Sequence, residues 1–168
     1  LPIRAWLQAI VERGWLPPLD RAQAGNALAI IGDERDFDEL ISIPAGLFLM
    51  GSVESDWDDE KPQHLIDLPA FQIGKYPVTN AQYRRFVEAT EREWDTEEGR
   101  KPEKANHPAV DVTWRDARAY CAWLTVQWHT TGLLGADKEV RLPTEAEWEK
   151  AARAGDARGE AAGVARAG

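Results

Sequence analysis

The stretch that decides the fold is Val140–Gly155, which reads V-R-L-P-T-E-A-E-W-E-K-A-A-R-A-G. Pro143 can continue neither a strand ladder nor a helix, so it marks a bend. Thr144 and Glu147 have the spacing of a capping box, in which each side chain satisfies a backbone N–H of the other residue. An apolar stripe comes next at helical spacing, formed by Trp148, Ala151 and Ala152. With Gly155 as a natural stop, the stretch predicts a strand end, a rigid turn and a capped helix.

Two further capping boxes precede helical stripes. Thr79 pairs with Gln82 in one box, and Thr113 pairs with Asp116 in the other. The stripes after them are Tyr83, Phe86 and Val87 in the first helix, and Ala117, Tyr120, Cys121, Leu124 and Trp128 in the second. Three such boxes, each after a residue that fits an extended approach, predict an α+β domain with short helices on a small sheet. Long alternating β-α-β units are missing from the sequence, which argues against a doubly wound sheet.

Short apolar runs predict the strands. Leu40–Ile43 and Leu47–Met50 flank the turn Pro44–Gly46, and this arrangement predicts a hairpin. Leu65–Leu68 and Phe71–Ile73 are predicted as two further strands. Two charged or glycine-containing segments without periodicity are predicted as irregular loops, the first of them solvated: Glu91–His107 and Thr130–Lys138.

The N-terminal part predicts two amphipathic helices. Leu1–Arg13 forms the first, and Pro17-Pro18 ends it. Asp20 is the predicted cap of the second helix, which Gly32 ends. We therefore expect a helical leader or linker over residues 1–38, the main domain over residues 39–155, and a low-complexity, disordered tail over residues 156–168.

Composition narrows the classes of partner. The net charge of −9 argues against nucleic acid and against an anionic membrane surface, because both bind clustered Lys and Arg. The chain has no apolar run of membrane-spanning length and no signal peptide pattern. A single cysteine forms no internal disulfide, so a cytoplasmic location is expected. Because the first residue is Leu1 rather than Met, we expect a segment of a longer protein.

Five blocks in a fixed order carry a family resemblance. They are I-P-A-G-L-F-L-M-G-S (Ile43–Ser52), D-E-K-P-Q-H (Asp59–His64), F-Q-I-G-K-Y-P-V-T-N-A-Q-Y-R-R-F (Phe71–Phe86), H-P-A-V-D-V-T-W-R-D-A-R-A-Y-C-A-W-L (His107–Leu124) and R-L-P-T-E-A-E-W-E-K-A-A-R (Arg141–Arg153). In this order the blocks resemble the sulfatase-modifying-factor family of formylglycine-generating-enzyme-like domains. The resemblance covers roughly residues 40–155, and five ordered blocks are far more specific than one short motif.

The resemblance implies an incomplete, loop-rich variant of the C-type-lectin-like fold. The best-known family members oxidise a sulfatase cysteine to formylglycine with molecular oxygen and copper held by two cysteines. Relatives include iron-dependent sulfoxide synthases and domains attached to signalling NTPases, kinases or proteases. In the catalytic members the copper-binding cysteines lie in a C-terminal half with aromatic blocks that this sequence lacks. The resemblance therefore implies the N-terminal part of the domain, with some of its apolar stripes left uncovered.

For each residue that could take part in catalysis or metal binding, a purely structural role is also considered. Cys121 is the single thiol, and its place on an apolar helical stripe favours a small buried hydrophobe over a nucleophile. Metal-ligand spacing is missing among the three histidines, His64, His107 and His129. The acidic residues of Glu54–Glu60 favour a solvated loop over a calcium site, and Trp57 within it either folds back or awaits a ligand.

Glu145, Glu147 and Glu149 near Arg141 include a conceivable acid–base pair. Capping and the helix dipole explain these carboxylates without a substrate. We therefore assign no catalytic, cofactor-binding or metal-binding residue. Phosphate-loop, dinucleotide and serine-hydrolase motifs are also missing from the sequence.

Two functional hypotheses remain. In the first, the chain is a non-catalytic recognition module of a larger bacterial protein, with a covalently linked upstream domain and a protein or peptide ligand. In the second, it is the N-terminal half of a copper-dependent formylglycine-generating oxidase or of a related nonheme-iron enzyme. Fold resemblance by itself does not decide between them.

Overall fold

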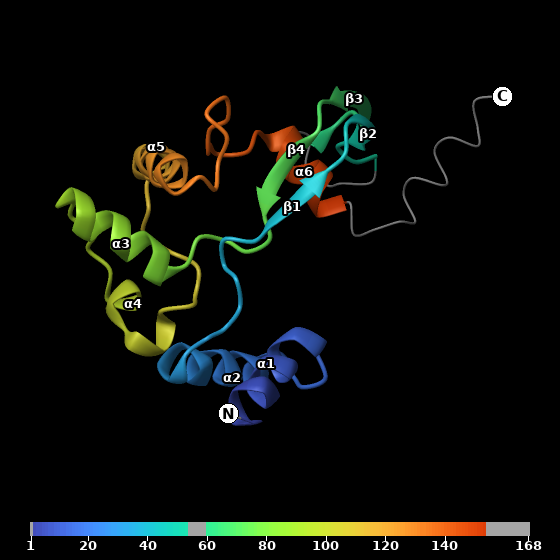
Figure 1. Cartoon of the computed structure of the whole chain (residues 1–168). Helices are drawn as coiled ribbons and strands as arrows, with labels where there is room; N and C mark the ends of the chain where they lie inside the picture. The colour runs from blue at the N-terminus through green and yellow to red at the C-terminus, as the bar shows by residue number, and fades with distance from the viewer. Residues whose placement is uncertain (1, 54–59, 154–168) are drawn as a thin grey trace. The chain divides into compact units, whose positions relative to one another are not determined.

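The computed structural model describes residues 2–53 and 60–153, and Figure 1 shows their helices and strands. The chain divides into two compact units. Of the described residues, the helical unit contains 2–39 and 76–141, and the ribbon unit contains 40–53, 60–75 and 142–153. Helices and short strands together give the predicted α+β class.

The helical unit begins with α1 (Pro2–Arg13), which packs against α2 (Pro18–Ile31). The predicted cap at Asp20 is wrong, because α2 begins two residues earlier and Asp20 lies in its first turn. Pro18 explains the earlier start, since proline has a helical φ and lacks the N–H that a cap would satisfy. Gly32 ends the helix as predicted, at φ 104°, with its N–H donating to Leu28 O.

The two capped helices predicted in this unit are confirmed as α3 (Asn80–Thr90) and α5 (Trp114–Thr131). The Thr79 N–H donates to Gln82 Oε1 at 2.9 Å, and the Gln82 N–H donates to Thr79 Oγ1 at 3.3 Å. The Asp116 N–H donates to Thr113 Oγ1 at 3.2 Å in the same way. The irregular segment after α5 starts at Gly132, which has φ 73°.

The segment predicted as a solvated loop, Glu91–His107, instead contains α4 (Glu97–Arg100) and the short 3-10 helix η2 (Pro102–Lys104). Thr96 is only 4% exposed and caps α4 by accepting from the Gly99 N–H. A Cβ on Gly99 would lie 2.3 Å from the Trp94 ring, so the position requires glycine. Trp94 explains the error, because its ring packs on Tyr83 at 5.0 Å between centroids and draws the segment inward.

Aromatic rings form the interior of this part of the chain. Tyr83 and Phe86 of α3 meet Tyr120 of α5 at centroid distances of 5.6 Å each, and Phe86 is 1% exposed. Trp123 joins the cluster at 5.7 Å from Phe86. These rings pack α3 against α5.

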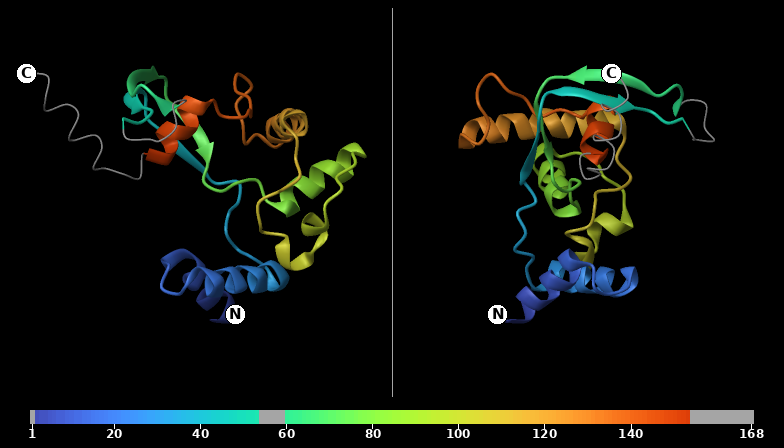
Figure 2. Two further views of the ribbon diagram at one scale, coloured as in Figure 1. Left: turned by 180° about the vertical axis from the view of Figure 1, so that it is seen from behind. Right: turned by 90° about the vertical axis from the view of Figure 1, so that its right-hand side faces the viewer.

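The ribbon unit contains the four predicted strands, but their pairing differs from the prediction. They are β1 (Leu40–Ile43), β2 (Gly46–Met50), β3 (His64–Leu68) and β4 (Phe71–Gly74). The predicted hairpin between the first two strands is wrong, because β1 pairs with β4 and β2 pairs with β3. Figure 2 shows β1–β2 running beside β3–β4 as one long bent ribbon.

Proline explains this pairing. The ladders stop at Ile43↔Phe71 and resume at Gly46↔Leu68, so the gap of two residues between them contains Pro44 on one strand and Pro69 on the other. Neither proline can donate a ladder hydrogen bond, and the ribbon bends there instead of turning back.

The last described helix is α6 (Glu145–Arg153). Its predicted capping box is confirmed, with the Thr144 N–H donating to Glu147 Oε2 at 2.8 Å. Its predicted apolar stripe is not the buried face, since Trp148 is 63% exposed while Glu147 and Lys150 are buried. The predicted stop at Gly155, the tail 156–168 and the loop residues 54–59 lie outside the described residues. None of the described helices is long and apolar enough to cross a membrane.

Candidate functional site

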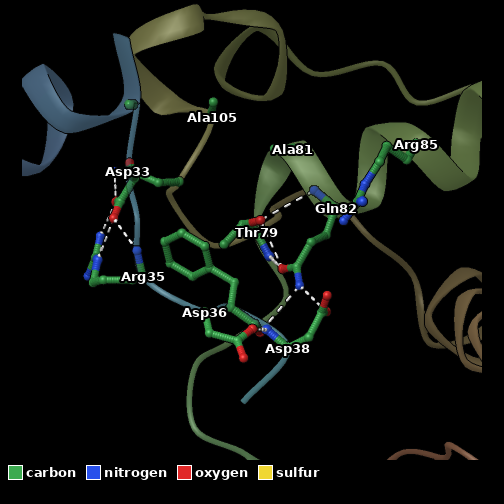
Figure 3. A pocket seen from close by; sticks show the side chains of 12 residues that line it. Asp33, Arg35, Asp36, Asp38, Thr79, Ala81, Gln82, Arg85 and Ala105 are labelled. Atoms are coloured by element: carbon green, nitrogen blue, oxygen red, sulfur yellow. Dashed lines mark hydrogen bonds and ion pairs between the residues drawn. The ribbon is translucent and has the colours of Figure 1, made fainter. Parts of the chain in front are cut away.

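A cavity of about 370 Å³ opens in the helical unit beside the N-terminal end of α3 (Figure 3). The segment 33–38 forms one wall, and Thr79, Gln82 and Arg85 form another. Ala29, Ala81, Ala105 and Asn106 complete the lining. The sequence did not single out this place, because its walls come from three separate stretches of the chain.

A buried ion pair stands at one end of the cavity. Arg35 Nη2 lies 2.5 Å from Asp33 Oδ2, and Arg35 Nε donates to Asp33 Oδ1 at 2.9 Å. Asn106 Nδ2 also donates to Asp33 Oδ2 at 2.7 Å. Burial by itself raises the pKa of the Asp33 carboxyl, but these hydrogen bonds outweigh it and hold the pKa below 3.8. Asp33 is therefore an ionised, fully engaged carboxylate rather than a free general base.

The guanidinium of Arg35 also stacks on aromatic rings. Its central carbon lies 4.9 Å from the centroid of Phe37 and 5.6 Å from that of Tyr76. The two rings meet edge to face at 5.4 Å. The odd-numbered residues of the segment 33–38 are half-buried and the even-numbered ones are exposed. The sequence D-E-R-D-F-D does not reveal this alternation, because charged residues occupy both sets of positions.

Gln82 stands at the other end of the cavity and has two tasks. Its Oε1 accepts from the Thr79 N–H and the Thr79 hydroxyl, both at 2.9 Å. Its Nε2 donates to Asp38 Oδ1 at 2.7 Å and to Phe37 O at 3.3 Å. The capping residue of α3 is therefore also a contact point for the segment 33–38.

Each of the three histidines contacts a different hydrogen-bond partner. His107 Nε2 lies 2.6 Å from the side-chain amide of Asn26, and burial together with the Lys104 charge lowers the pKa of His107. His64 Nδ1 lies 2.8 Å from Pro62 O, and His129 Nε2 lies 2.8 Å from Lys138 O. Each imidazole has a local hydrogen-bond partner.

The single cysteine is half-buried on α5. Burial raises the pKa of the Cys121 thiol, which keeps it protonated and weakly nucleophilic. The copper that the family resemblance implies needs two thiolates, so the residues of this chain do not fit that ion. Within residues 2–53 and 60–153, no three His, Cys, Asp or Glu side chains gather in a way that could hold a metal. The alternative of a calcium site in Glu54–Glu60 is not tested, because residues 54–59, which include Trp57, lie outside the described part of the chain.

The carboxylates of α6 perform structural tasks. Glu147 closes the capping box, and Glu145 is exposed in the first turn. Glu149 accepts from the Gly51 N–H at 2.9 Å and pairs with Arg153 at 2.6 Å. Arg141 belongs to the other compact unit. Lys150 Nζ donates to Gly46 O at 2.8 Å. The sequence alone did not predict this contact, because its acceptor is a backbone atom.

These features define an α+β protein in which Thr-capped helices accompany a bent antiparallel ribbon. The sulfatase-modifying factor enzyme 1-like domain matches residues 29–162. The chain therefore belongs to the sulfatase-modifying-factor, or formylglycine-generating-enzyme-like, family.

Named relatives differ in activity. The chain is 36% identical over 135 residues to serine/threonine-protein kinase Pkn1 of Chlamydia trachomatis, a match over 70% of this chain and 20% of the kinase. It is 30% identical over 170 residues to the formylglycine-generating enzyme of Mycobacterium tuberculosis, over 70% of this chain and 52% of the enzyme. The match thus spans between a fifth and about half of these relatives.

A solved structure supports the fold. PvdO from Pseudomonas aeruginosa superposes with a TM-score of 0.54 and 34% identity, over 70% of this chain and 48% of PvdO. The α+β fold of the family is therefore shown for this chain.

Proposed function

We propose that this chain is the N-terminal part of a formylglycine-generating-enzyme-like domain that serves as a non-catalytic recognition module in a longer cytoplasmic protein. Its ligand is a protein or peptide rather than nucleic acid or a membrane, in keeping with the net charge of −9. The module is covalently linked to an upstream domain, such as a kinase.

One observation carries this proposal: the carboxylates and the thiol that could take part in catalysis are already held in structural contacts. Asp33 is held by Arg35 and Asn106, and Glu147 caps α6. Burial raises the pKa of the Cys121 thiol and so lowers its thiolate fraction and its reactivity as a nucleophile. A recognition scaffold needs such groups only for shape, whereas an oxidase needs some of them free to meet a metal or substrate.

The relative named as a kinase supports the link to a larger protein. Only 20% of Pkn1 matches this chain, so in that protein the family domain accompanies much additional sequence. In a comparable arrangement, this chain would bind a protein or peptide ligand and so bring the linked catalytic domain close to it.

The alternative, an oxidase half, is favoured by the match to a formylglycine-generating enzyme over 52% of its length. In that case the metal ligands would come from outside these 168 residues. The two proposals differ in what the longer protein does to a substrate cysteine.

The test uses the longer protein that contains this chain. It is incubated with oxygen, copper, an external thiol as the source of the second electron pair, and a sulfatase peptide that carries the target cysteine, and the peptide is analysed by mass spectrometry. We expect an unchanged peptide, while a formylglycine-generating enzyme run in parallel converts it. Conversion of the cysteine to an aldehyde would refute the non-catalytic proposal and support the oxidase. The same experiment with iron tests the nonheme-iron version.

A further inference from the structure

The leader helices and the helices α3 and α5 have separate buried residues in the helical unit. Ile10, Ala24 and Leu28 are buried in α1 and α2, with exposed fractions of 6%, 5% and 1%. The aromatic cluster of Tyr83, Phe86 and Tyr120 draws its packing partners from residues 87–124. No leader residue belongs to this cluster in the described part of the chain.

Polar contacts join the leader to the rest of the unit. Asn106 Nδ2 donates to Gly25 O at 2.8 Å as well as to Asp33. The Asn26 amide meets His107, and Gln82 Nε2 donates to Asp38 and to Phe37 O. In the described part of the chain α2 also lies against η2, the Phe37 ring meets Tyr76, and the Arg35 guanidinium lies over the Tyr76 ring. Polar groups exchange protein partners for water at a smaller net free-energy change than buried apolar surface does.

We propose that these contacts form a releasable latch, which lets α1 and α2 leave the body of the helical unit while α3 and its cap stay folded. Gln82 is the central residue of the latch, because one end of its amide caps α3 and the other end holds the leader (Figure 3). A partner bound to the leader, or a domain attached to it, would act on α3 through this amide. This movement of the leader does not depend on the identity of a ligand.

The chain itself indicates how to separate the two tasks of Gln82. In α6, Glu147 occupies the same capping position, and its Oε2 accepts from the Thr144 N–H and hydroxyl at 2.8 and 3.0 Å. Both capping residues are 6% exposed. A glutamate at position 82 therefore keeps the cap of α3, but it cannot donate to Asp38 and instead repels it.

The experiment measures the distance between the leader and α3 in the full chain. Spin labels are attached to cysteines introduced at the exposed positions Ala5 and Ala89, in a Cys121→Ala background, and the distance distribution is recorded by pulsed electron resonance. We expect Gln82→Glu to broaden the distribution and to raise the population of longer distances roughly tenfold. Asp38→Asn is the matched control, since Asn at position 38 still accepts from Gln82 and should leave the distribution unchanged.

The double variant Gln82→Glu with Asp38→Asn tests the mechanism, because Asn at position 38 can donate to the new carboxylate. We expect it to restore most of the original distribution. Hydrogen exchange of the α3 amides serves as the second measurement, and it should not change in Gln82→Glu. An unchanged distance distribution, a failure of the double variant to restore it, or faster exchange throughout α3 would each overturn the latch.

Discussion

Aromatic rings connect α3 and α5 in the helical unit, whereas charged side chains hold α6 on the ribbon. In the helical unit, Phe86 and Tyr120 meet edge to face at 88°, and Phe86 is 1% exposed. In the ribbon unit, the buried residues of α6 are Glu147 and Lys150. Lys150 donates to Gly46 O, and Arg153 donates to Gly51 O at 2.8 Å.

The same capping box opens both helices, so the difference arises from the residues after the box. Thr79 and Gln82 start α3, which buries Tyr83 and Phe86. A box of the same type starts α6, which leaves Trp148 63% exposed. A cap therefore decides where a helix begins and does not decide which face it buries.

The largest expected effect is the loss of the aromatic cluster in Phe86→Ala. Removing a fully buried phenylalanine ring costs about 3–5 kcal/mol, which is a large part of the stability of a small domain. Urea denaturation followed by circular dichroism measures this loss. Trp114→Ala is the control, because Trp114 is 64% exposed and its removal should change stability little. Equal losses in the two variants would contradict the aromatic interior.

Phe48→Ala tests the ribbon unit in the same way. Phe48 is 8% exposed, and Lys150 Nζ lies 5.9 Å from its ring centroid. We expect a loss of about 3 kcal/mol, the lower end of the range for a buried phenylalanine, because Ile43 is the only other buried apolar residue described in the ribbon unit. Hydrogen exchange of the β2 and β3 amides should report the loss. Leu65→Ala, at a position 64% exposed, is the matched control.

The sequence predicted the local features of both units well. The capping boxes at Thr79, Thr113 and Thr144 were found because the two partners in each are three residues apart. The four strands were found from their apolar runs. The helix α4 was missed because its four residues are too few to show a periodicity.

Features that depend on distant partners escaped prediction. The pairing of β1 with β4 places Pro44 and Pro69 in the same two-residue gap between the ladders, which is visible only once the register is known. The buried face of α6 depends on Lys150 reaching a backbone carbonyl, and hydropathy does not record backbone acceptors. Similarly, the cluster at Asp33 needs Asn106, which lies 73 residues away. The candidate cavity was therefore outside the reach of sequence patterns.

Lys150→Met tests whether polar contacts, rather than apolar packing, hold α6 against the ribbon. The methionine keeps most of the apolar stem but leaves Gly46 O without this donor, which should cost about 1–2 kcal/mol. Faster hydrogen exchange of the amides in β2 is the expected signature. Lys138→Met is the control, because Lys138 is exposed in the helical unit. Unchanged exchange in β2 would show that the helix is held by other contacts.

Thr79→Ala and Thr144→Ala compare the same cap in the two units. Loss of a threonine cap typically costs about 1 kcal/mol. We expect the larger loss for Thr79, which is 2% exposed and leaves the buried Gln82 oxygen without its hydroxyl donor, whereas Thr144 is exposed. Thermal unfolding of the two variants gives the ranking. The reverse order would indicate that burial of the cap does not add to its effect.

The smallest expected effect is a pH dependence confined to the helical unit. Burial, followed by the charge of Lys104, lowers the pKa of His107 below its ordinary value of 6.5. The unfolded chain therefore takes up the proton first as the pH falls. Stability should be higher above pH 6.5 and should decrease slightly as the pH falls below it.

His107→Gln should remove this decrease, since glutamine has no proton to gain and can still form a hydrogen bond with Asn26. His64→Gln, in the ribbon unit, is the matched control and should leave the response of the helical unit in place. Urea denaturation at several pH values, with hydrogen exchange read separately in α3 and in β2, measures both variants. A decrease of the same size in β2 would mean that the two units unfold as one, and the contrast between their interiors would then no longer govern their stability.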